Sequence, residues 1–301
     1  MLVVREARPD DAAAVVPFLV EVLRGRPDAY RAIFKFAESS IGLIDDDGKN
    51  RPLGAVLERP DGSIAGFLGV LASRVPYVTP GWLQHLTSWA VAEDARSHGL
   101  RLLHFLVQAR PGVLANFSGT AAVQAILPRF GFTSVDEAEL TFSTLSFSGL
   151  RSRLAGNCAT GADVLNFITN ADQRRVVRDH LAVGCRAIAV ELDGRKVSAI
   201  LFQLGGIPYS TAQLIHLFPS DDETINAIWP RLKGFCVYDM RCPRLRVDAR
   251  FAPKTEQPLL RKPRQMFAKN FSGNARTITR AFGEPLNTWI SLNAVNAAQS
   301  N

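Results

Sequence analysis

The stretch that decides the fold is LQHLTSWAVAEDARSHGLRLLHFLVQARPGVLANFSGTAAVQAILPRFGF, which runs from Leu83 to Phe132. An apolar run is followed by a short polar loop and an apolar helical pattern, and then strand and helix recur. The predicted strands and helices have bounds Leu83–Val91, Leu102–Gln108, Val113–Phe117 and Thr120–Phe130. Upstream, two apolar runs flank Arg59-Pro60-Asp61-Gly62-Ser63, which is typical of a hairpin. An antiparallel meander followed by a strand–helix–strand unit predicts a mixed α/β sheet.

The hexapeptide Arg96-Ser97-His98-Gly99-Leu100-Arg101 opens the first of these helices. A loop that feeds directly into a helix leaves backbone N–H groups that point the same way, and the helix dipole adds partial positive charge. Such a place suits a phosphate or a pyrophosphate. Arg96 would add a charge-assisted hydrogen bond, and Gly99 would let the backbone approach the anion. The alternative is a helix that simply starts after an arginine and a glycine, as many helices do.

The stretch resembles the acyl-CoA-binding core of the GNAT acyltransferase superfamily. In that family a strand ending in Val leads to the pattern Q/R-x-x-G-x-G/A, whose amides hold the pyrophosphate of CoA. Arg96 and Gly99 stand where the family's Gln or Arg and its first Gly would stand after Val91. The resemblance covers roughly residues 1 to 147, and the other segments that carry it are Val3–Asp11, Asn116, Thr120–Ala122 and Gly131-Phe132.

The resemblance implies a GNAT-like fold and an acyl-CoA co-substrate, acetyl-CoA or another, without a metal. It implies that the cofactor is bound by Trp89, Val91, Arg96, Ser97, His98, Gly99, Leu100, Arg101 and Asn116. For Asn116, a cap at the start of the following helix is an equal alternative. Arg101 replaces the family's last Gly or Ala, so its long side chain would either close the groove or reach a phosphate. Leu127 replaces the family's frequent general-acid Tyr, and nothing in the sequence assigns that role to Tyr77 or Tyr209.

His85 is the candidate catalytic residue. It precedes Val91 at about the offset at which histone acetyltransferases of the resembling family place a general-base Glu. With a reference pKa of about 6.5, an imidazole can accept a proton from an ammonium nucleophile at neutral pH. The alternative is a histidine that is packed in a strand with one hydrogen-bond partner.

The composition is that of an ordinary globular protein, with 301 residues of which 47% are hydrophobic and 21% are charged. The length predicts two domains, a GNAT-like acyl-CoA-binding domain over 1–150 and a second domain over 151–301. No apolar run has the length of a transmembrane helix and no secretory signal is evident, so we expect a cytoplasmic protein without a membrane partner. The 4 cysteines form no C-x-x-C pattern, which favours reduced thiols over a disulfide framework or a zinc site.

The formal net charge of +7 suits an anionic partner, and both CoA and nucleic acid are anionic. No basic stripe with interleaved aromatic residues is present, which argues against nucleic acid. The segment from Arg250 to Arg280 is rich in Lys and Arg, and Arg261-Lys262-Pro263-Arg264 within it could bind an anionic acceptor or the CoA 3′-phosphate. A solvated basic loop is the simpler interpretation.

The second half of the chain echoes the first. Asp61-Gly62, a strand, a Pro-Tyr turn and His85 are matched by Asp193-Gly194, a strand, another Pro-Tyr turn and His216. Such self-similarity suggests a tandem duplication. The echo ends where a cofactor would bind, because Pro219–Glu223 carries three carboxylates, which would repel a pyrophosphate, and no Arg-x-x-Gly. We therefore expect a degenerate GNAT-like domain that shapes the acceptor site.

Three functions are compatible with these patterns. The first is an acyl-CoA-dependent acyltransferase, in the first instance an acetyltransferase, that moves an acyl group by direct attack to an amine or hydroxyl. Its acceptor could be a small molecule such as a sugar, an amino acid or a polyamine, or a protein lysine, and a homodimer is left open. The second, suggested by Arg101 and Leu127, is a GNAT-shaped binding or regulatory protein without catalysis. The third is an aminoacyl-tRNA-dependent transferase, for which the basic C-terminal segment is the only support.

Overall fold

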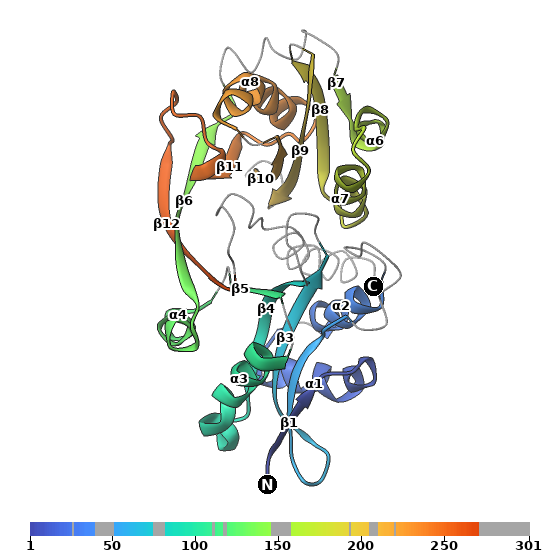
Figure 1. The fold of residues 1–301 in the computed structure, drawn as a ribbon, viewed down its shortest axis with the longest axis vertical. Coiled ribbons are helices and arrows are strands. Elements are labelled where there is room, and N and C mark those ends of the chain that lie inside the picture. The colour runs from blue at the N-terminus through green and yellow to red at the C-terminus, as the bar shows by residue number, and fades with distance from the viewer. Residues whose placement is uncertain are drawn as a thin grey trace. The chain divides into compact units, whose positions relative to one another are not determined.

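The computed structural model describes residues 1–25, 27–39, 51–74, 82–109, 112–116, 119–145, 158–192, 194–204, 210–219 and 221–270 (Figure 1). Contacts between Cα atoms group these residues into two compact units. The first unit comprises Met1–Val135 and a segment that begins at Met266, and the second unit comprises Asp136–Gln265.

The sheet of the first unit is mixed, with strands in the order β1-β2-β3-β4-β5 followed by the end of β12, of which Phe267–Lys269 pair with β5. The bounds are Val3–Glu6, Gly54–Glu58, Ile64–Ser73, Trp82–Val91, Gly112–Asn116 and Leu260–Lys269. Neighbouring strands run antiparallel except β4 and β5, which run parallel. A parallel pair needs a crossover connection, and here α3 (Gly99–Ala109) supplies it.

The predicted hairpin between β2 and β3 is confirmed. The backbone N–H of Arg59 donates to the carbonyl of Ser63 at 2.8 Å, and that of Gly62 donates to the carbonyl of Arg59 at 2.9 Å. Gly62 has φ of 83°, a left-handed conformation that glycine adopts without a steric cost. The Arg59 guanidinium also binds both carboxylate oxygens of Asp94 at 2.9 Å. This contact ties the hairpin to the loop that leaves β4.

Helices cover both faces of this sheet. Successive strand residues point to opposite faces, and in β3 Leu68 packs in one core cluster with Leu102 of α3. The preceding Phe67 faces the other way and stacks on Phe34 of α2, with 6.1 Å between ring centroids. The other helices of this unit are α1, α2 and α4, with bounds Ala12–Leu23, Pro27–Glu38 and Ala121–Ile126.

The sheet of the second unit repeats this pattern, with strands in the order β6-β11-β10-β9-β8-β7. The bounds are Thr133–Ser143, Arg244–Asp248, Thr211–Phe218, Arg195–Leu204, Arg186–Leu192 and Cys158–Thr160. Here β10 and β11 are the parallel pair, and the other neighbours are antiparallel. The helices include α6, α7 and α8, with bounds Val164–Phe167, Ala171–Ala182 and Asp222–Tyr238.

The core of the second unit lies between this sheet and α8. Ile228, Trp229 and Leu232 of α8 are at most 4% exposed and belong to its main apolar cluster. Trp229 meets Phe142 of β6 edge to face, with 5.0 Å between ring centroids. Its indole N–H also donates to Glu256 at 2.7 Å. An aromatic ring that is buried with its polar atom satisfied adds packing without leaving an unmade hydrogen bond.

In each sheet the strand beside the parallel pair comes from a distant part of the chain. In the first unit β12 pairs with β5, and the Lys269 ammonium donates to the carbonyl of Phe130 at 2.7 Å. In the second unit β6 pairs with β11, with Ser143 opposite Arg244 and Glu139 opposite Asp248. The predicted boundary after residue 150 lies outside the described residues and stays a prediction, while the described residues group into units that separate after Val135. A strand's hydrophobic pattern identifies its buried face but not its partner.

None of the helices in the described ranges has both the length and the apolar character that crossing a membrane requires.

Candidate functional site

The parallel strands β4 and β5 separate partway along their length. Their register runs from Trp82 opposite Gly112 to His85 opposite Ala115. Beyond that point β5 keeps its pairing with β12, in which Asn116 lies opposite Phe267. We call the point where the two strands separate the β4–β5 fork. Backbone groups of strands that part in this way face the gap and need other partners.

A bulge in β4 lies next to the fork. Thr87 pairs with Gly69 and Ala90 pairs with Phe67, so Ser88 and Trp89 lie opposite the single residue Leu68. Ser88 has φ of 48°, in the left-handed region that residues with a Cβ avoid. An extra residue bends the strand and increases its twist. The bulge lies just beyond the last position at which β4 pairs with β5.

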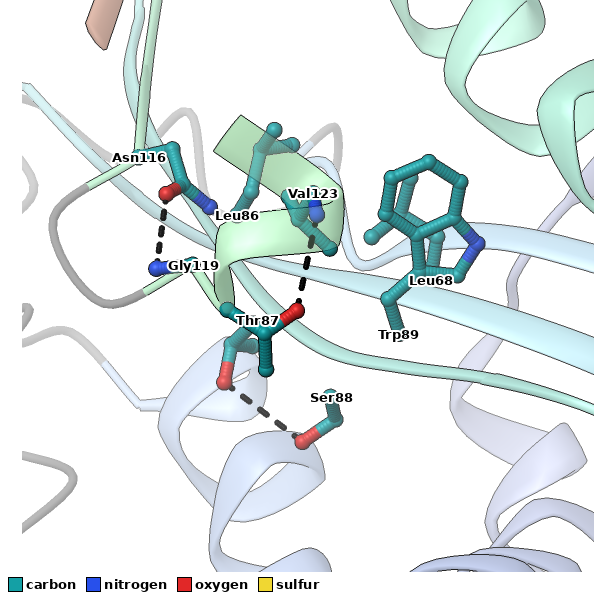
Figure 2. A pocket seen from close by; sticks show the side chains of 9 residues that line it. Leu68, Leu86, Thr87, Ser88, Trp89, Asn116, Gly119 and Val123 are labelled. Atoms are coloured by element: carbon teal, nitrogen blue, oxygen red, sulfur yellow. Dashed lines mark hydrogen bonds between the residues drawn. The ribbon is translucent and has the colours of Figure 1, made fainter. Parts of the chain in front are cut away.

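A cavity of about 160 Å³ occupies the fork (Figure 2). It is lined by Leu68, Leu86, Thr87, Ser88, Trp89, Asn116, Gly119, Thr120 and Val123. The hydroxyls of Thr87 and Ser88 lie 3.4 Å apart, and the indole of Trp89 lies beside Leu68. The cavity thus has polar groups on β4 and an apolar wall formed by Leu68, Leu86 and Val123.

Asn116 and Thr120 hold the other side of the cavity. The Oδ1 atom of Asn116 accepts from the backbone N–H of Gly119 at 2.9 Å. This bond fixes the orientation of the carboxamide and leaves its Nδ2 as a donor. Thr120 caps α4, since its Oγ1 accepts from the backbone N–H of Val123. The sequence allowed Asn116 to cap the following helix, but in the structure the cap is Thr120, four residues further along the chain. Asn116 instead accepts a hydrogen bond from Gly119 in the loop before α4.

His85 is the last residue of β4 that is in register with β5, between Leu71 of β3 and Ala115 of β5. It is 3% exposed. Its neighbour Leu86 belongs to the core cluster on the α3 side and lines the cavity. By alternation, the imidazole points to the opposite face, toward α1 and α2. His85 therefore flanks the fork without lining its cavity.

The loop predicted to bind a phosphate is helical. Glu93–His98 forms a 3-10 helix, and α3 begins directly at Gly99. The backbone N–H of Gly99 donates to the carbonyl of Arg96, and its φ of −57° is an ordinary helical value. A Cβ at Gly99 would lie 3.1 Å from Cγ2 of Val91. Glycine here lets the start of α3 pack against the end of β4, whatever further role it has.

The side chains of this loop point in several directions. Arg96 faces Glu93 at 3.9 Å, and both are exposed. Arg96 and Val91 line a second hollow of about 450 Å³ together with Phe18 of α1. The Arg101 guanidinium donates to the carbonyl of Leu2 at 3.1 Å. In this conformation it is directed toward the edge of β1.

The structure thus divides the nine predicted cofactor residues. Trp89 and Asn116 line the fork cavity, and Val91 and Arg96 line the second hollow. The remaining five, which line neither, are Ser97, His98, Gly99, Leu100 and Arg101. Leu127, in the family's tyrosine position, is fully buried in the apolar core. Tyr77 and Tyr209 lie outside the described residues.

Seven lining residues are absent from the predicted site: Leu68, Leu86, Thr87, Ser88, Gly119, Thr120 and Val123. A local signal existed for Thr120, because a threonine before an apolar helical run is a typical N-cap. The others required knowledge of the bulge in β4, and a continuous apolar strand pattern contains no mark of one extra residue.

Side-chain hydrogen bonds cross the corresponding fork of the second unit. Its parallel register ends at Gln213 opposite Arg246. The Arg246 guanidinium donates to Gln213 Oε1 at 2.9 Å and to Glu139 Oε1 at 3.2 Å. Gln213, rather than His216, therefore holds the register position that His85 holds in the first unit. His216 lies beyond the bulge of β10, which falls between Leu214 and His216.

His216 is instead part of a buried histidine pair. Burial and the nearby positive charges of His180 and Arg250 lower the pKa of His216 to about 3. Burial lowers the pKa of His180 to about 4, although its Nδ1–H donates to the carbonyl of Val176 at 2.7 Å. Both imidazoles are neutral at physiological pH. A neutral, buried position suits packing better than proton exchange with a substrate.

No cluster of three or more His, Cys, Asp or Glu side chains is placed to hold a metal ion within the ranges that the structure describes. Two mixed α/β units in tandem, each with one parallel pair that parts at a bulge, define the class of this protein.

Comparison with solved structures identifies that class as the GNAT fold. A GCN5-related N-acetyltransferase from Anabaena variabilis matches with a TM-score of 0.56 at 9% identity, covering 89% of this chain and 72% of that chain. A conserved protein of unknown function from Enterococcus faecalis matches with a TM-score of 0.55 at 11% identity, with the same coverages. A tandem GNAT protein from the clavulanic acid biosynthesis pathway matches with a TM-score of 0.51 at 11% identity, covering 89% of this chain and 98% of that chain.

No protein-family model matches the chain, and no curated protein matches its sequence. At identities of 9–11%, the structural likenesses establish the fold alone. The protein has two GNAT-like domains in tandem, which confirms the resemblance of the first half and the predicted repeat in the second half.

Proposed function

We propose that the first unit binds an acyl-CoA in the β4–β5 fork and transfers its acyl group to an amine or hydroxyl acceptor. The observation that carries the proposal is the separation of β4 from β5 beyond His85 and Ala115. The backbone N–H and C=O groups that face the gap suit an extended ligand with amides of its own, which would bind as an added strand does. The pantetheine arm of CoA is such a ligand, because it carries two amides.

The lining of the cavity supports the reactive end of such a ligand. Thr87, Ser88 and the Nδ2 of Asn116 can donate hydrogen bonds, and donors held in place can stabilise the oxyanion that forms when a thioester is attacked. The apolar wall of Leu86 and Val123 suits a short acyl chain. A cavity of about 160 Å³ favours acetyl or another small acyl group over a long one.

His85 is proposed as the general base, acting from the face of β4 that α1 and α2 cover. An acceptor that reaches the imidazole would lose a proton to it and attack the thioester carbon at the fork. The new bond forms from nitrogen or oxygen to that carbon, the carbon–sulfur bond breaks, and CoA leaves as a thiolate. Leu127 cannot supply a proton to the thiolate, so the proposal leaves that step to water or to the protonated His85.

The test of cofactor binding is thermal unfolding with and without acetyl-CoA. At about 100 times its Kd, a ligand that binds only the folded state adds about 2.7 kcal/mol. For domains of this size that raises Tm by roughly 2–4 °C per kcal/mol. We expect Val123→Phe, which fills the cavity, to abolish the shift. Ala122→Phe is the matched control, because Ala122 lies on the same helix but is exposed and does not line the cavity.

An unchanged Tm of the wild-type protein at millimolar acetyl-CoA would contradict the proposal. Equal loss of the shift in both phenylalanine variants would place the ligand elsewhere. If the shift depends on Val123, transfer to amine and hydroxyl acceptors is then followed by the release of free CoA thiol.

A second candidate function is a GNAT-shaped binding or regulatory protein without catalysis. It is favoured by the helical form of the predicted phosphate loop, in which the N–H of Gly99 already donates to Arg96. The burial of Leu127 in the tyrosine position supports the same interpretation. Binding of acetyl-CoA without release of CoA thiol, across a broad set of acceptors, would favour this function over acyl transfer.

A further inference from the structure

A hollow on the outer side of α7, in the second unit, is lined by three arginines. Its volume is about 390 Å³, and its lining consists of Leu165, Ala171, Arg174, Arg175 and Arg178. No carboxylate lines it among the residues that the structure describes. On a helix, positions three and four apart share one face. The arginines therefore gather on the side of α7 that lies away from the buried Val176 and Val177.

Arg174 is held in a fixed orientation. Its Nε and Nη2 donate to the carbonyl of Ile168 at 3.0 Å and 2.7 Å. A guanidinium has five N–H groups in a planar fork, so these two bonds leave the donors of Nη1 for another partner. Holding the side chain in advance reduces the entropy that a ligand would otherwise cost. The residue is thus prepared for binding rather than free to sample solvent.

Arg178 extends the same surface. Its guanidinium contacts the adjacent Asp179, whose Oδ1 lies 3.4 Å from Nε and 3.5 Å from Nη2, both at the weak end of the range for a hydrogen bond. The Arg178 side chain is 61% exposed, while that of Asp179 is 9% exposed. Most of the Arg178 guanidinium therefore faces the hollow and solvent.

The position of these charges in the helix is unfavourable without an anion. α7 begins after Asn170, whose side chain accepts from the backbone N–H of Gln173 at 2.9 Å. Arg174 lies at the end of the first turn of α7, where the dipole favours negative charge, and Arg175 and Arg178 follow it along the helix. Like charges three and four positions apart also repel one another. A bound oxyanion reverses both effects.

We propose that this hollow binds the phosphate group of a small phosphorylated molecule. Guanidinium forks match the oxygens of a phosphate and bind them through charge-assisted hydrogen bonds. Leu165 and Ala171 give an apolar edge against which the rest of the molecule can lie. The volume falls within the range of about 300–1,000 Å³ that is typical of small-molecule sites. This site lies within the second unit and does not depend on acyl transfer in the first.

The test is a calorimetric titration of the full-length protein, once with inorganic phosphate and once with adenosine monophosphate. The triple variant R174Q/R175Q/R178Q removes the cluster. The matched control R31Q/K35Q/R129Q removes the same charge from exposed positions of the first unit. We expect the triple variant to bind about 100-fold more weakly or not at all, since each charge-assisted bond contributes about tenfold or more. We expect the control to bind as the wild type does.

A single variant separates binding from folding. Arg178→Gln leaves the contacts of Arg174 with Ile168 intact, so the loop before α7 keeps its support, and we expect about tenfold weaker binding of both probes. Absence of phosphate binding by the wild type, or equal weakening in the control variant, would overturn the proposal. Much tighter binding of a single-stranded RNA than of adenosine monophosphate, with a steep salt dependence, would also overturn it in favour of an RNA surface.

Discussion

The forks of the two units share a backbone and differ in one pair of residues. At the last parallel position, the first unit has His85 opposite Ala115, and the second has Gln213 opposite Arg246. Neither His85 nor Ala115 lines the cavity of the first fork, whose walls come from the neighbouring residues of both strands, from β3 and from the start of α4. In the second fork, Arg246 binds groups on both neighbouring strands. The two repeats thus keep the same strand arrangement but place different side chains, with different partners, at the last parallel position.

The largest expected effect concerns the base. We expect His85→Ala to lower kcat for acetyl transfer by about 100-fold or more, a usual scale for the loss of an acid–base group. Gln213→Ala, at the same register position of the second unit, should leave kcat unchanged. Steady-state kinetics on both variants, with circular dichroism as the folding check, measures the comparison. Equal rates for His85→Ala and the wild type would remove His85 from the mechanism.

The next effect concerns the side chains that cross the second fork. Arg246→Ala leaves the carboxylate of Glu139, whose side chain is 7% exposed, without this partner. We expect a loss of about 1–3 kcal/mol in the free energy of unfolding, because a buried polar group then loses a charged hydrogen bond. Adding Glu139→Gln should recover part of that loss, because the stability effects of substitutions at residues in direct contact do not simply add. Urea unfolding of the two single variants and the double variant measures this coupling. If the losses in unfolding free energy of the single variants add up to that of the double variant, the contact between Arg246 and Glu139 does not stabilise the fold.

Acid should act on the second unit through its histidine pair. Their folded pKa values, about 4 for His180 and about 3 for His216, lie below the unfolded value of 6.5. Below pH 6.5 the unfolded state therefore binds protons that the folded state does not, and stability falls as the pH drops toward the folded values. The slope reaches about 1.4 kcal/mol per pH unit for each histidine.

The measurement is the urea midpoint between pH 7 and pH 4.5. Because carboxylates also contribute to acid sensitivity, the informative quantity is the difference between the wild type and His180→Gln. This variant should be less stable at pH 7 but lose stability less steeply on acidification. An unchanged slope would mean that His180 is protonated in the folded protein.

The smallest expected effect concerns the two bulges. Ser88 has φ of 48°, whereas Ile215, in the bulge of β10, is not among the positive-φ residues of the described chain. Ser88→Gly should therefore be more stable than Ser88→Ala by about 0.5–1 kcal/mol, since only glycine adopts this conformation without a steric cost. Ile215→Gly should instead destabilise the protein. Thermal unfolding distinguishes the signs, and a more stable Ser88→Ala would show that the conformation carries no strain.

Much of the fold could be predicted from local patterns. The strand expected over Leu83–Val91 is β4, and the hairpin at Arg59–Ser63 is present. These features depend on contacts between residues near in sequence, such as a glycine with positive φ or an apolar run of strand length. The echo in the second half was likewise visible, and the tandem GNAT fold confirms it.

The site was less accessible to sequence reasoning. The family pattern directs attention to Arg96–Arg101, whereas the cavity lies at the fork and is lined by residues of β3, β4 and the start of α4. The echo also pairs His85 with His216, although strand register places Gln213 at the corresponding position. Spacing along the chain cannot reveal this, because a bulge shifts the register by one residue without changing the apolar pattern.

The sequence by itself determined elements such as β4 and the hairpin of β2 and β3, because propensity, periodicity and turn chemistry are local. Residues 261–264, expected as a solvated basic loop, lie instead in strand β12. Only the tertiary structure decided which strand lies beside which. It put β12 next to β5 and β6 next to β11, and it left a cavity at one fork and crossed the other with side-chain hydrogen bonds. Pairing between segments far apart in the chain depends on how whole surfaces fit once they are folded, and that information is not contained in any single stretch of residues.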